Sequence, residues 1–329
     1  MRPVQWGVLG VADHYIKRVH LPVRASDVCE VRAIASRSQQ KAEAAAARLG
    51  IPAAYGSYEA LLADPKVEAV YIPLPNHLHL EYIKKCADAG KHVLCEKPMG
   101  MDAAQVQQAI DYTRGKGVML MEAFMYRFHP QWTHLRDLVQ CGEIGTVHAL
   151  QSSFFYSNKD PHNIRNILSM GGGAIYDIGC YCVSSARFLT AREPQRVVAR
   201  VTRDPQFGTD ILSSGILDFG DIQATFVCGT QTFPHQHVHV FGSGGSAWVE
   251  VPFNIYPDVP VVTIVRTGVG ERVIQHGPLD QYALQFERFS VALRESGPAP
   301  TLPEDALANQ NVLDALFASE KSGDWQPVG

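Results

Sequence analysis

The order of apolar segments in the first part of the chain is the feature that most constrains its fold. Short apolar runs typical of β-strands alternate there with longer segments of helical pattern, several of which end at a glycine. Strands are predicted at residues 4–9, 28–35, 69–72, 92–95 and 118–121, and helices at residues 39–49, 79–89 and 103–116. Strands that alternate with helices of about 10 to 15 residues form a parallel, doubly wound α/β sheet. A ligand of such a sheet binds at the carboxyl ends of its strands.

The second part of the chain has a different pattern. Strands are predicted at residues 147–156, 195–203, 211–218, 222–229, 237–242, 247–251 and 261–267, and helices at residues 174–189 and 303–321. Such a succession of neighbouring strands is typical of a mostly antiparallel sheet with one covered face, an α+β arrangement. Because 329 residues exceed what one hydrophobic core usually serves, two domains are expected, residues 1–123 and residues 124–302.

Composition and charge exclude several classes of protein. The net charge of −4 gives no electrostatic reason to expect nucleic acid or an anionic membrane surface as a partner. No apolar run reaches the roughly 18 residues needed to cross a bilayer. The strand pattern that begins at residue 4 leaves no room for a signal peptide. The 7 cysteines include no C-x-x-C pair, so we expect reduced thiols and a cytoplasmic protein.

The turn after the first predicted strand carries part of a dinucleotide-binding fingerprint. Gly10, Ala12 and Tyr15 stand at the three glycine places of the G-x-G-x-x-G pattern, and Asp13 lies in the same turn. A methyl group at the second place still lets a phosphate approach the backbone, whereas a tyrosine at the third place predicts a shifted or lengthened turn. Glycine-rich turns also arise for packing reasons, so this motif alone leaves a nucleotide site open.

The end of the second predicted strand bears on which dinucleotide would bind. An NAD site places Asp or Glu there to hold the ribose hydroxyls, but this chain has Ser36 and Arg37, with Lys41 one helical turn on. A hydroxyl, a guanidinium and an ammonium suit the 2′-phosphate of NADP. The alternative is a solvated helix start, but helix N-termini favour acids over cations. The expected cofactor is therefore NADP.

Four segments of the chain resemble those of a known family. They are PLPNHLH at residues 73–79, AGKHVLCEKP at residues 89–98, EAFMYRFHP at residues 122–130 and GGGAIYDIGCY at residues 171–181. With them the chain resembles the Gfo/Idh/MocA oxidoreductase family over essentially its whole length. Within that family it is most similar to the branch of glucose–fructose oxidoreductase, NADP-linked D-xylose dehydrogenase and trans-dihydrodiol dehydrogenase.

The resemblance has consequences for the fold and the assembly. It implies a Rossmann-like N-terminal domain and a C-terminal domain with an open-faced, mostly antiparallel sheet. It also implies that the open face pairs with a second subunit in a homodimer or a higher homo-oligomer. The helix predicted at residues 303–321 is expected to pack back on the first domain.

The same resemblance assigns roles to residues of both domains. Lys97 of the E-K-P segment is expected beside the nicotinamide and the reacting hydroxyl, Tyr181 as the acid and base, and Asp177 in the substrate pocket. The inositol dehydrogenase branch carries a histidine at the place of Tyr181, so the tyrosine favours the sugar and dihydrodiol branch. Further cofactor contacts are expected from Leu74, Pro75, Asn76, His79 and Glu96.

Three glycines at residues 171–173 precede the helix that carries Asp177 and Tyr181. They would let this helix begin close to the nicotinamide, with its first backbone amides facing the reaction. A free tyrosine has a pKa near 10, and the ammonium of Lys97 would favour the phenolate. In oxidation, the phenolate would take the substrate's hydroxyl proton while hydride leaves for the nicotinamide, and Asp177 would accept hydrogen bonds from neighbouring hydroxyls. The alternative for Tyr181 is an ordinary half-buried aromatic residue.

Three histidines alternate at the strand predicted for residues 237–242. His235, His237 and His239 would share one face of that strand, which points to a zinc site. Ligands from one flat strand close a tetrahedral site poorly. A polar sheet face, at a subunit contact, is therefore the preferred interpretation, and no metal is expected.

The expected function is that of an NADP-dependent oxidoreductase that transfers hydride between the nicotinamide and a secondary alcohol or hemiacetal of a sugar. Reduction of a keto-sugar and dehydrogenation of a trans-dihydrodiol stay open, because both would use the same Lys97 and Tyr181. The alternative outside the enzymes is an NADP-sensing regulatory protein, although the presence of both residues argues against it. The expected partner is a small carbohydrate or polyol. Candidates to line its pocket, with surface or core positions as the alternative, are Tyr156, Arg165 and His129.

Overall fold

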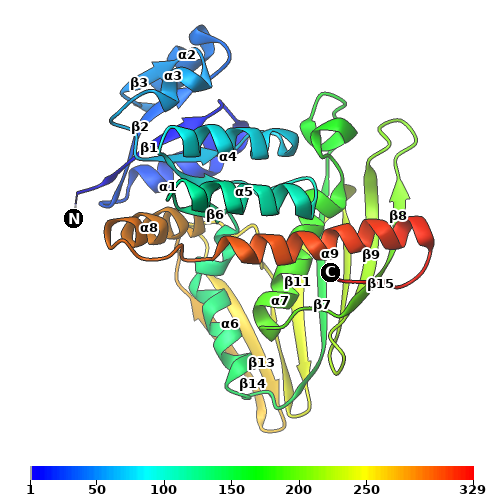
Figure 1. Cartoon of the computed structure of the whole chain (residues 1–329). Helices are drawn as coiled ribbons and strands as arrows, with labels where there is room; N and C mark the ends of the chain where they lie inside the picture. The colour runs from blue at the N-terminus through cyan, green and yellow to red at the C-terminus, as the bar shows by residue number, and fades with distance from the viewer. Residues whose placement is uncertain (1) are drawn as a thin grey trace. The chain divides into compact units, whose positions relative to one another are not determined.

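The computed structural model describes residues 2–329, and the chain divides into two compact units. The first unit comprises the chain up to Met125 together with Tyr282–Leu307, and the second comprises Tyr126–Gln281 and Ala308–Gly329. In Figure 1 the blue to teal segments and the orange helix α8 belong to the first unit. Each unit has a β-sheet of its own.

The first unit is built on a six-stranded sheet in the order β3-β2-β1-β4-β5-β6. Every neighbouring pair of strands is parallel. The strands are β1 (Val4–Leu9), β2 (Cys29–Ala35), β3 (Ala53–Tyr55), β4 (Ala69–Ile72), β5 (His92–Cys95) and β6 (Leu120–Glu122). The strand order reverses between β1 and β4, the position at which doubly wound sheets bind their ligands. The predicted doubly wound fold is confirmed, with β3 as an additional strand.

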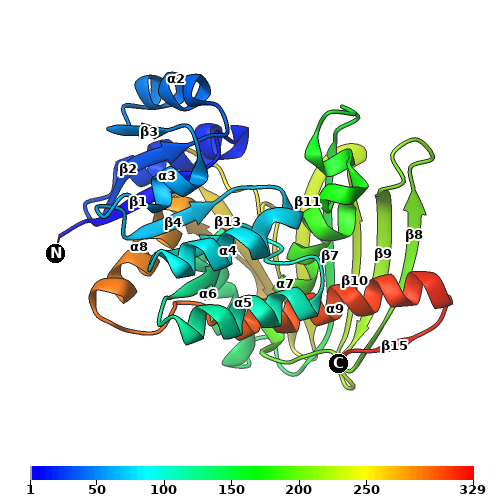
Figure 2. The same ribbon diagram turned by 45° about the horizontal axis from the view of Figure 1, so that its top comes forward.

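The helices of the first unit begin and end at residues suited to those positions. They are α1 (His20–Arg24), α2 (Gln39–Leu49), α3 (Tyr58–Leu62), α4 (His79–Asp88), α5 (Ala103–Gly115) and α8 (Gln281–Arg294). Ser38 caps α2 by accepting a hydrogen bond from the Lys41 amide at 3.3 Å, and Gly50 ends α2 in a left-handed conformation. Asp102 caps α5 in the same manner. The helices α4 and α5 lie side by side in Figures 1 and 2.

Helix α8 adds an aromatic layer to the core of the first unit. Trp6 of β1 is fully buried against Phe286 and Phe289, with ring centroids 4.6 and 5.1 Å away. The indole nitrogen of Trp6 donates a hydrogen bond to the Ser290 hydroxyl at 3.1 Å. Residues 282–302 were predicted to belong to the second domain, whereas the structure groups them with the first unit, because this helix buries a large aromatic side chain of β1.

The second unit contains a nine-stranded sheet in the order β14-β13-β12-β11-β7-β10-β9-β8-β15. Neighbouring strands are antiparallel, except that β7 and β10 are parallel. The strands are β7 (Val147–Ser157), β8 (Arg196–Arg203), β9 (Asp210–Asp218), β10 (Gln223–Gly229), β11 (Gln231–Gly242), β12 (Gly245–Val249), β13 (Val261–Thr267), β14 (Gly270–His276) and β15 (Gln326–Pro327). The predicted mostly antiparallel sheet is confirmed. The strands β14 and β15 were not predicted.

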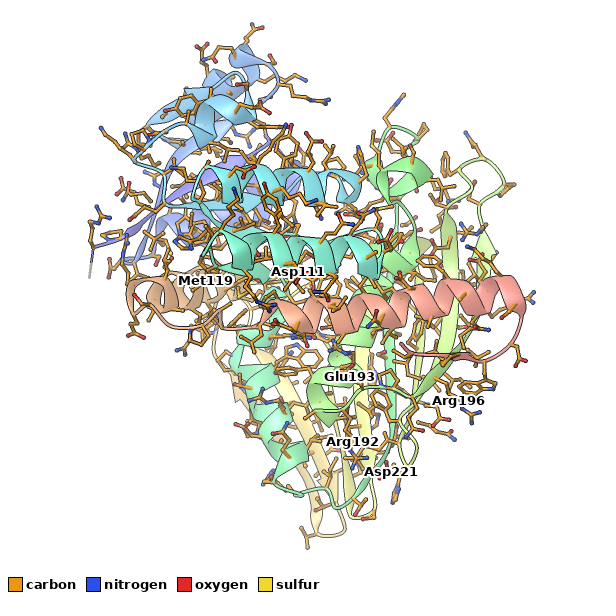
Figure 3. The ribbon with its side chains drawn as sticks, viewed as in Figure 1. Asp111, Met119, Arg192, Glu193, Arg196 and Asp221 are labelled. Atoms are coloured by element: carbon orange, nitrogen blue, oxygen red, sulfur yellow. The ribbon has the colours of Figure 1, made fainter. Side chains whose placement is uncertain are left out.

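Helices α6 (Pro130–Gln140) and α7 (Cys180–Thr190) pack on one face of this second sheet. The helix α6 contacts β12 and β13, and α7 contacts β7 and β10. Glu193, which is labelled in Figure 3, follows the end of α7 and accepts hydrogen bonds from the Arg187 guanidinium at 2.5 and 2.8 Å. This bidentate pair holds the chain where it leaves α7.

The opposite face of the second sheet carries the three histidines of β11. Val238 and Val240 of this strand are buried, whereas His235 is exposed and His237 and His239 are partly exposed. Because side chains alternate along a strand, the three imidazoles share the face opposite the helices. Neighbouring rings have centroids 6.4 and 5.7 Å apart. Within residues 2–329, no group of three His, Cys, Asp or Glu side chains is placed to hold a metal ion.

Helix α9 (Pro303–Ser322) contributes to both units. Its residues up to Leu307 belong to the first unit, and its remaining residues belong to the second, where Phe317 packs on Tyr176 with ring centroids 4.9 Å apart. This helix was predicted to pack on the first domain, and that contact stays a prediction for the residues that are grouped with the second unit. Neither this 20-residue helix nor any other in the described chain is long and apolar enough to cross a membrane.

Candidate active site

The turn after β1 brings the backbone close to the end of β4. Gly10 has a φ angle of +109°, which residues with a side chain rarely adopt. A Cβ atom on Gly10 would lie 3.1 Å from the Leu74 side chain. Ala12 is partly buried, and Asp13 is exposed and forms an ion pair with Lys17 at 2.9 Å. The turn therefore presents its backbone beside the small side chain of Ala12, as a phosphate-binding turn requires, while the Asp13 carboxylate is paired with Lys17.

Tyr15, which departs from the fingerprint, is buried beneath this turn. It begins the π-helix Tyr15–Val19, and its hydroxyl lies 2.9 Å from Nδ1 of His20. The other ring nitrogen of His20 lies 2.9 Å from the Leu49 carbonyl, so His20 donates to that carbonyl and accepts from the phenol. Burial raises the pKa of Tyr15 and lowers the pKa of His20, which keeps both groups neutral. The wider turn of a π-helix gives the tyrosine a place in the core.

Ser36, Arg37 and Lys41 lie at the end of β2 and the start of α2. The buried Ser36 hydroxyl accepts a hydrogen bond from the Ser38 amide at 3.3 Å. Arg37 and Lys41 are exposed, and neither forms an ion pair with another residue of the described chain. Two exposed cations beside a hydroxyl, at the carboxyl end of a parallel strand, suit an anionic group of a ligand.

The loop after β4 carries the partly buried Pro75 and Asn76 and the buried Leu74 and His79. The two ring nitrogens of His79 lie 2.8 Å from the carbonyl oxygens of Leu74 and Pro98. Burial lowers the pKa of His79, and the two carbonyl groups oppose that shift. His79 thus ties the loop after β4 to the loop after β5. Its contact with a cofactor stays a prediction.

Two carboxylates hold the turn after β5. Glu96 accepts a hydrogen bond from the Tyr71 hydroxyl at 2.6 Å and another from the Lys97 amide at 3.3 Å. Glu122 of β6 accepts a hydrogen bond from the Met99 amide at 2.7 Å. These contacts place Lys97, with a partly exposed side chain, at the carboxyl end of β5. Glu122 was not predicted as a site residue, although it begins the EAFMYRFHP segment.

Two of the three glycines at residues 171–173 lie close to other residues of the second unit. A Cβ atom on Gly172 would lie 2.5 Å from the Arg165 carbonyl oxygen. Gly173 has a φ angle of +123°, and a Cβ atom there would overlap the Asp210 carboxylate. The amide of Ile175 donates to Asp210 at 2.6 Å, and the amide of Asp177 donates to the Gly173 carbonyl at 3.1 Å. We expected the first amides of this helix to face the reaction. The amides of Ile175 and Asp177 do not, because both donate hydrogen bonds within the second unit.

Asp177 is the centre of a polar cluster in the second unit. It lies in the π-helix Ile175–Gly179, which leads directly into α7. Its Oδ2 atom accepts a hydrogen bond from the Tyr156 hydroxyl at 2.6 Å and another from Nε of Arg165 at 2.9 Å. Burial, and then the charge of Asp177, raise the pKa of Tyr156, so its phenol stays protonated and donates. The structure therefore brings together three of the predicted substrate residues.

Tyr181 lies in the first turn of α7, within an aromatic cluster. Its ring is buried, and its centroid lies 5.2 Å from that of Phe253, 5.7 Å from that of Phe154 and 5.9 Å from that of Tyr126. Edge and tilted contacts of this kind stabilise a fixed ring position. These ring contacts therefore fix the position of the Tyr181 phenol within the second unit.

His129 has a structural contact at the start of α6. Its ring is fully buried, and Nδ1 accepts a hydrogen bond from the Gln131 amide at 3.2 Å. Burial, and then the charge of His276, lower the pKa of His129 to about 4, so the ring is neutral at pH 7. The ring serves as the N-cap of α6. A substrate contact of His129 stays a prediction.

Taken separately, the two units define a class of protein. In the first, a glycine turn, a cluster with two cations and a lysine follow the carboxyl ends of β1, β2 and β5, the edge at which doubly wound sheets bind dinucleotides. The second adds a fixed carboxylate and, one helical turn later, a tyrosine. A dinucleotide-dependent oxidoreductase requires groups of these kinds.

Comparison with protein families gives a more specific assignment. Residues 4–124 match the model of an oxidoreductase family with an NAD-binding Rossmann fold. Residues 132–248 match the GFO/IDH/MocA C-terminal domain. The chain belongs to the GFO/IDH/MocA family of oxidoreductases, so both the family and the enzyme class predicted from the sequence motifs are confirmed.

Individual relatives lie in the predicted branch. The chain is 38% identical to D-xylose 1-dehydrogenase (NADP(+)) 2 of Haloferax volcanii, over 97% of this chain and 98% of that protein. It is 34% identical to trans-1,2-dihydrobenzene-1,2-diol dehydrogenase of Mus musculus, over 67% of this chain and 66% of that protein. Among solved structures, KijD10, a 3-ketoreductase from Actinomadura kijaniata in complex with NADP and TDP-benzene, is similar with a TM-score of 0.91 and 29% identity, covering 96% of this chain and 98% of that one.

Proposed function

We propose that this oxidoreductase uses NADP to transfer hydride to or from a secondary alcohol or hemiacetal of a sugar, in the manner of an aldose 1-dehydrogenase. The observation that carries the proposal is the carboxylate of Asp177, which Tyr156 and Arg165 hold in place one helical turn before Tyr181. A fixed hydrogen-bond acceptor next to a phenol suits a substrate with several adjacent hydroxyl groups. The similarity to a D-xylose 1-dehydrogenase over nearly the whole chain supports the same substrate class.

The residues of the first unit fit NADP. A side chain at position 10 would fill the space beside the turn after β1, and Arg37 and Lys41 are exposed cations that lack ion pairs within residues 2–329. The backbone of Gly10, Ala12 and Asp13 and the side chains of Ser36, Arg37 and Lys41 would hold the pyrophosphate and the 2′-phosphate. The rest of the cofactor would lie along Leu74, Pro75, Asn76, His79, Glu96 and Lys97. When bound, NADP supplies the nicotinamide ring that accepts or returns the hydride.

The proton of the reaction is assigned to Tyr181, with Lys97 as its electrostatic partner. In oxidation, the phenolate of Tyr181 takes the proton of the reacting hydroxyl, and in reduction the phenol returns it. The ammonium of Lys97 stabilises the negative charge that is shared between the phenolate oxygen and the substrate oxygen. Asp177 accepts hydrogen bonds from neighbouring hydroxyls and so fixes which carbon reacts.

A second candidate activity is the reduction of a keto-sugar or the oxidation of a trans-dihydrodiol. The structural similarity to a 3-ketoreductase and the sequence similarity to a trans-dihydrodiol dehydrogenase favour it as the alternative. Both activities would use Lys97 and Tyr181 in the roles given above. A regulatory protein that only senses NADP does not agree with membership of an oxidoreductase family.

Two further proposals concern the assembly and the location of the protein. The face of the second sheet that carries the three histidines also exposes Leu212, Val227 and Val273. Exposed apolar side chains on a sheet face favour burial against another copy, so we propose a homodimer or larger homo-oligomer, and a monomeric mass in light scattering would contradict it.

All 7 cysteines are free thiols, which supports a cytoplasmic location, and secretion of the native protein with paired cysteines would contradict that proposal.

Turnover of a sugar panel tests the proposed function. Purified protein with NADP⁺ and each of a set of aldopentoses and aldohexoses is expected to form NADPH, seen as absorbance at 340 nm, with at least one of them. The same panel is extended to keto-sugars with NADPH and to trans-dihydrodiols with NADP⁺. Turnover that is confined to one of these last two classes would replace the aldose assignment by the second candidate. No turnover with any class would contradict the proposed function.

Replacement of Arg37 by aspartate is expected to change the cofactor preference. A guanidinium lost from a phosphate contact, with a carboxylate in its place, should weaken NADPH binding about tenfold to a hundredfold. NADH lacks the 2′-phosphate, so its affinity should change much less. Fluorescence titration with both cofactors measures the two dissociation constants.

The matched control for this prediction is Arg48→Asp. Arg48 is exposed in the last turn of the same helix α2, so the variant makes the same charge change away from the strand end. It should leave both affinities nearly unchanged. Equal losses of NADPH and NADH binding in Arg37→Asp would contradict the assignment of the 2′-phosphate.

A further inference from the structure

Asp210 is a buried acid of the second unit that the proposed chemistry does not use. It is the first residue of β9, and only 1% of its surface is exposed. Its Oδ2 atom accepts a hydrogen bond from the Ile175 amide at 2.6 Å and another from the Ser213 hydroxyl at 3.2 Å. Asp210 thus connects a strand of the sheet to the start of the helix that carries Asp177.

The contact between Asp210 and Ile175 has the chemistry of a helix cap. The first amides of a helix lack partners within the helix and favour a negative charge next to them. The cap of this helix comes from a strand 35 residues away in the sequence, because the residues just before the helix are glycines. A carboxylate from the sheet therefore does here what a side chain before the helix usually does.

Gly173 and Asp210 fit each other closely. Gly173 has a φ angle of +123°, and a Cβ atom on it would overlap Oδ1 of the carboxylate. Any side chain at position 173 would displace Asp210 from the Ile175 amide. Position 173 therefore requires a glycine, because the Asp210 carboxylate lies so close to its backbone.

The energetics also favour a defined role for this carboxylate. Burial raises the pKa of Asp210, while the hydrogen bonds from Ile175 and Ser213 and the charge of Arg203 lower it. A carboxylate without such partners would be strongly destabilising in the interior. Its donors therefore hold it in one position, and through the Ile175 amide it holds the helix start in turn.

A second contact holds the same segment from another side. The Arg165 carbonyl accepts a hydrogen bond from the Gly173 amide at 2.9 Å, and Nε of Arg165 donates to Asp177 at 2.9 Å. The segment from Gly173 to Asp177 is thus fixed at its start by Arg165, at Ile175 by Asp210 and at its end by Arg165 again. A small shift of this segment would move both the Asp177 carboxylate and the Tyr181 phenol further along the helix.

We infer that Asp210 is a positioning residue, which sets the place of Asp177 and Tyr181 by capping the helix that carries them. The inference rests on the proposed function, because the two residues meet a substrate only there. Asp210 itself touches neither substrate nor cofactor in this account. Its effect reaches the reaction through the Ile175 amide, and misplacement of reacting groups by about 1 Å lowers rates up to a hundredfold.

Three variants test the inference by turnover. Asp210→Ala should lower kcat with the best sugar about tenfold or more, while the dissociation constant of NADP stays within about twofold, since the cofactor residues lie in the first unit. Asp210→Asn should keep kcat within about threefold of wild type, because an amide oxygen still accepts from the Ile175 amide. Ser213→Ala is the matched control. It removes the other hydrogen bond to the same oxygen, leaves the cap in place, and should lose less than Asp210→Ala.

Hydrogen–deuterium exchange gives a readout that does not depend on turnover. Peptides that cover residues 173–178 should exchange faster in Asp210→Ala than in wild type, and at nearly the wild-type rate in Asp210→Asn and Ser213→Ala. If Asp210→Ala does not fold, Gly173→Ala replaces it, because the added methyl group would displace the carboxylate from the Ile175 amide.

The possible outcomes separate the inference from the proposed function. Full turnover in Asp210→Ala, or an equal loss in Ser213→Ala, would overturn the positioning role and leave the proposed function intact. Absence of turnover in the wild type with every substrate would overturn the proposed function. It would also overturn the claim that the Asp210 cap positions catalytic groups. If the wild type shows no turnover, hydrogen–deuterium exchange still tests the capping contact. Unchanged exchange in Asp210→Ala would overturn that contact, and faster exchange would support it.

Discussion

Tyr181→Phe is expected to lower turnover by about a hundredfold or more and to leave the affinity for NADP nearly unchanged. The variant removes only the hydroxyl group. The ring that remains keeps its contacts with Phe253, Phe154 and Tyr126, so the fold of the second unit should persist. Steady-state kinetics with the best substrate of the panel, together with a fluorescence titration of NADPH, measures both quantities.

A second phenol of the same aromatic cluster provides the control. The fully buried Tyr126 hydroxyl lies 2.7 Å from the Ser184 hydroxyl and accepts a hydrogen bond from Nε of Arg127 at 3.4 Å. Tyr126→Phe makes the same chemical change and removes these structural hydrogen bonds, so it should lower stability by about 1–3 kcal/mol and change turnover by less than about threefold. Full turnover in Tyr181→Phe would remove Tyr181 from the mechanism, and an equal loss in Tyr126→Phe would attribute the effect to packing.

Lys97→Met is the second substitution with a large expected effect. Methionine keeps much of the length of the lysine side chain and lacks its charge, so the turn between Glu96 and Met99 should retain its backbone contacts with Glu96 and Glu122. Loss of a charge that stabilises the developing anion should lower kcat about a hundredfold or more. Without the ammonium, oxidation should also require a higher pH to reach half of its maximal rate, because the phenolate is then less favoured.

The pH profile separates this role from a structural one. A merely structural defect would lower the rate at every pH and leave the profile in place. Lys66→Met is the control, since Lys66 is exposed and precedes β4 at the amino edge of the first sheet. It should leave both the rate and the profile unchanged. A Lys97→Met variant with the wild-type rate and profile would exclude Lys97 from the chemistry.

The sequence predicted most of the fold because its periodicity is local. The strands of the first sheet are short apolar runs, and the buried face of β11 alternates with its polar face. Helix α8 was not predicted, and residues 282–302 were placed in the second domain, for the opposite reason. Its partner, Trp6, lies far away in the sequence, and no local pattern shows which sheet an amphipathic helix will cover. The strand β14 is mostly exposed and therefore lacks the alternation that identifies strands.

The same distinction applies to the candidate site. The sequence pointed to Asp177, Tyr156 and Arg165 separately, and the structure joins them through one carboxylate oxygen. It did not point to Asp210 or Glu122, because each acts on a backbone amide of a segment remote in sequence. Asp210 begins a strand that also contains two serines and a second aspartate, so its local sequence does not distinguish it from an ordinary acid at a strand end.

The most direct test of the account is a crystal structure of the protein with NADP⁺ and the aldose that it oxidises best. The measured quantities are the distances from Oη of Tyr181 and Nζ of Lys97 to the oxygen of the reacting hydroxyl. We expect the phenol within hydrogen-bond distance of that oxygen, about 2.6–3.2 Å, and the ammonium within the same reach of the phenol or of the oxygen. A bound sugar whose reacting oxygen meets neither group, even through one bridging water, would contradict the claim that the two side chains act on one proton.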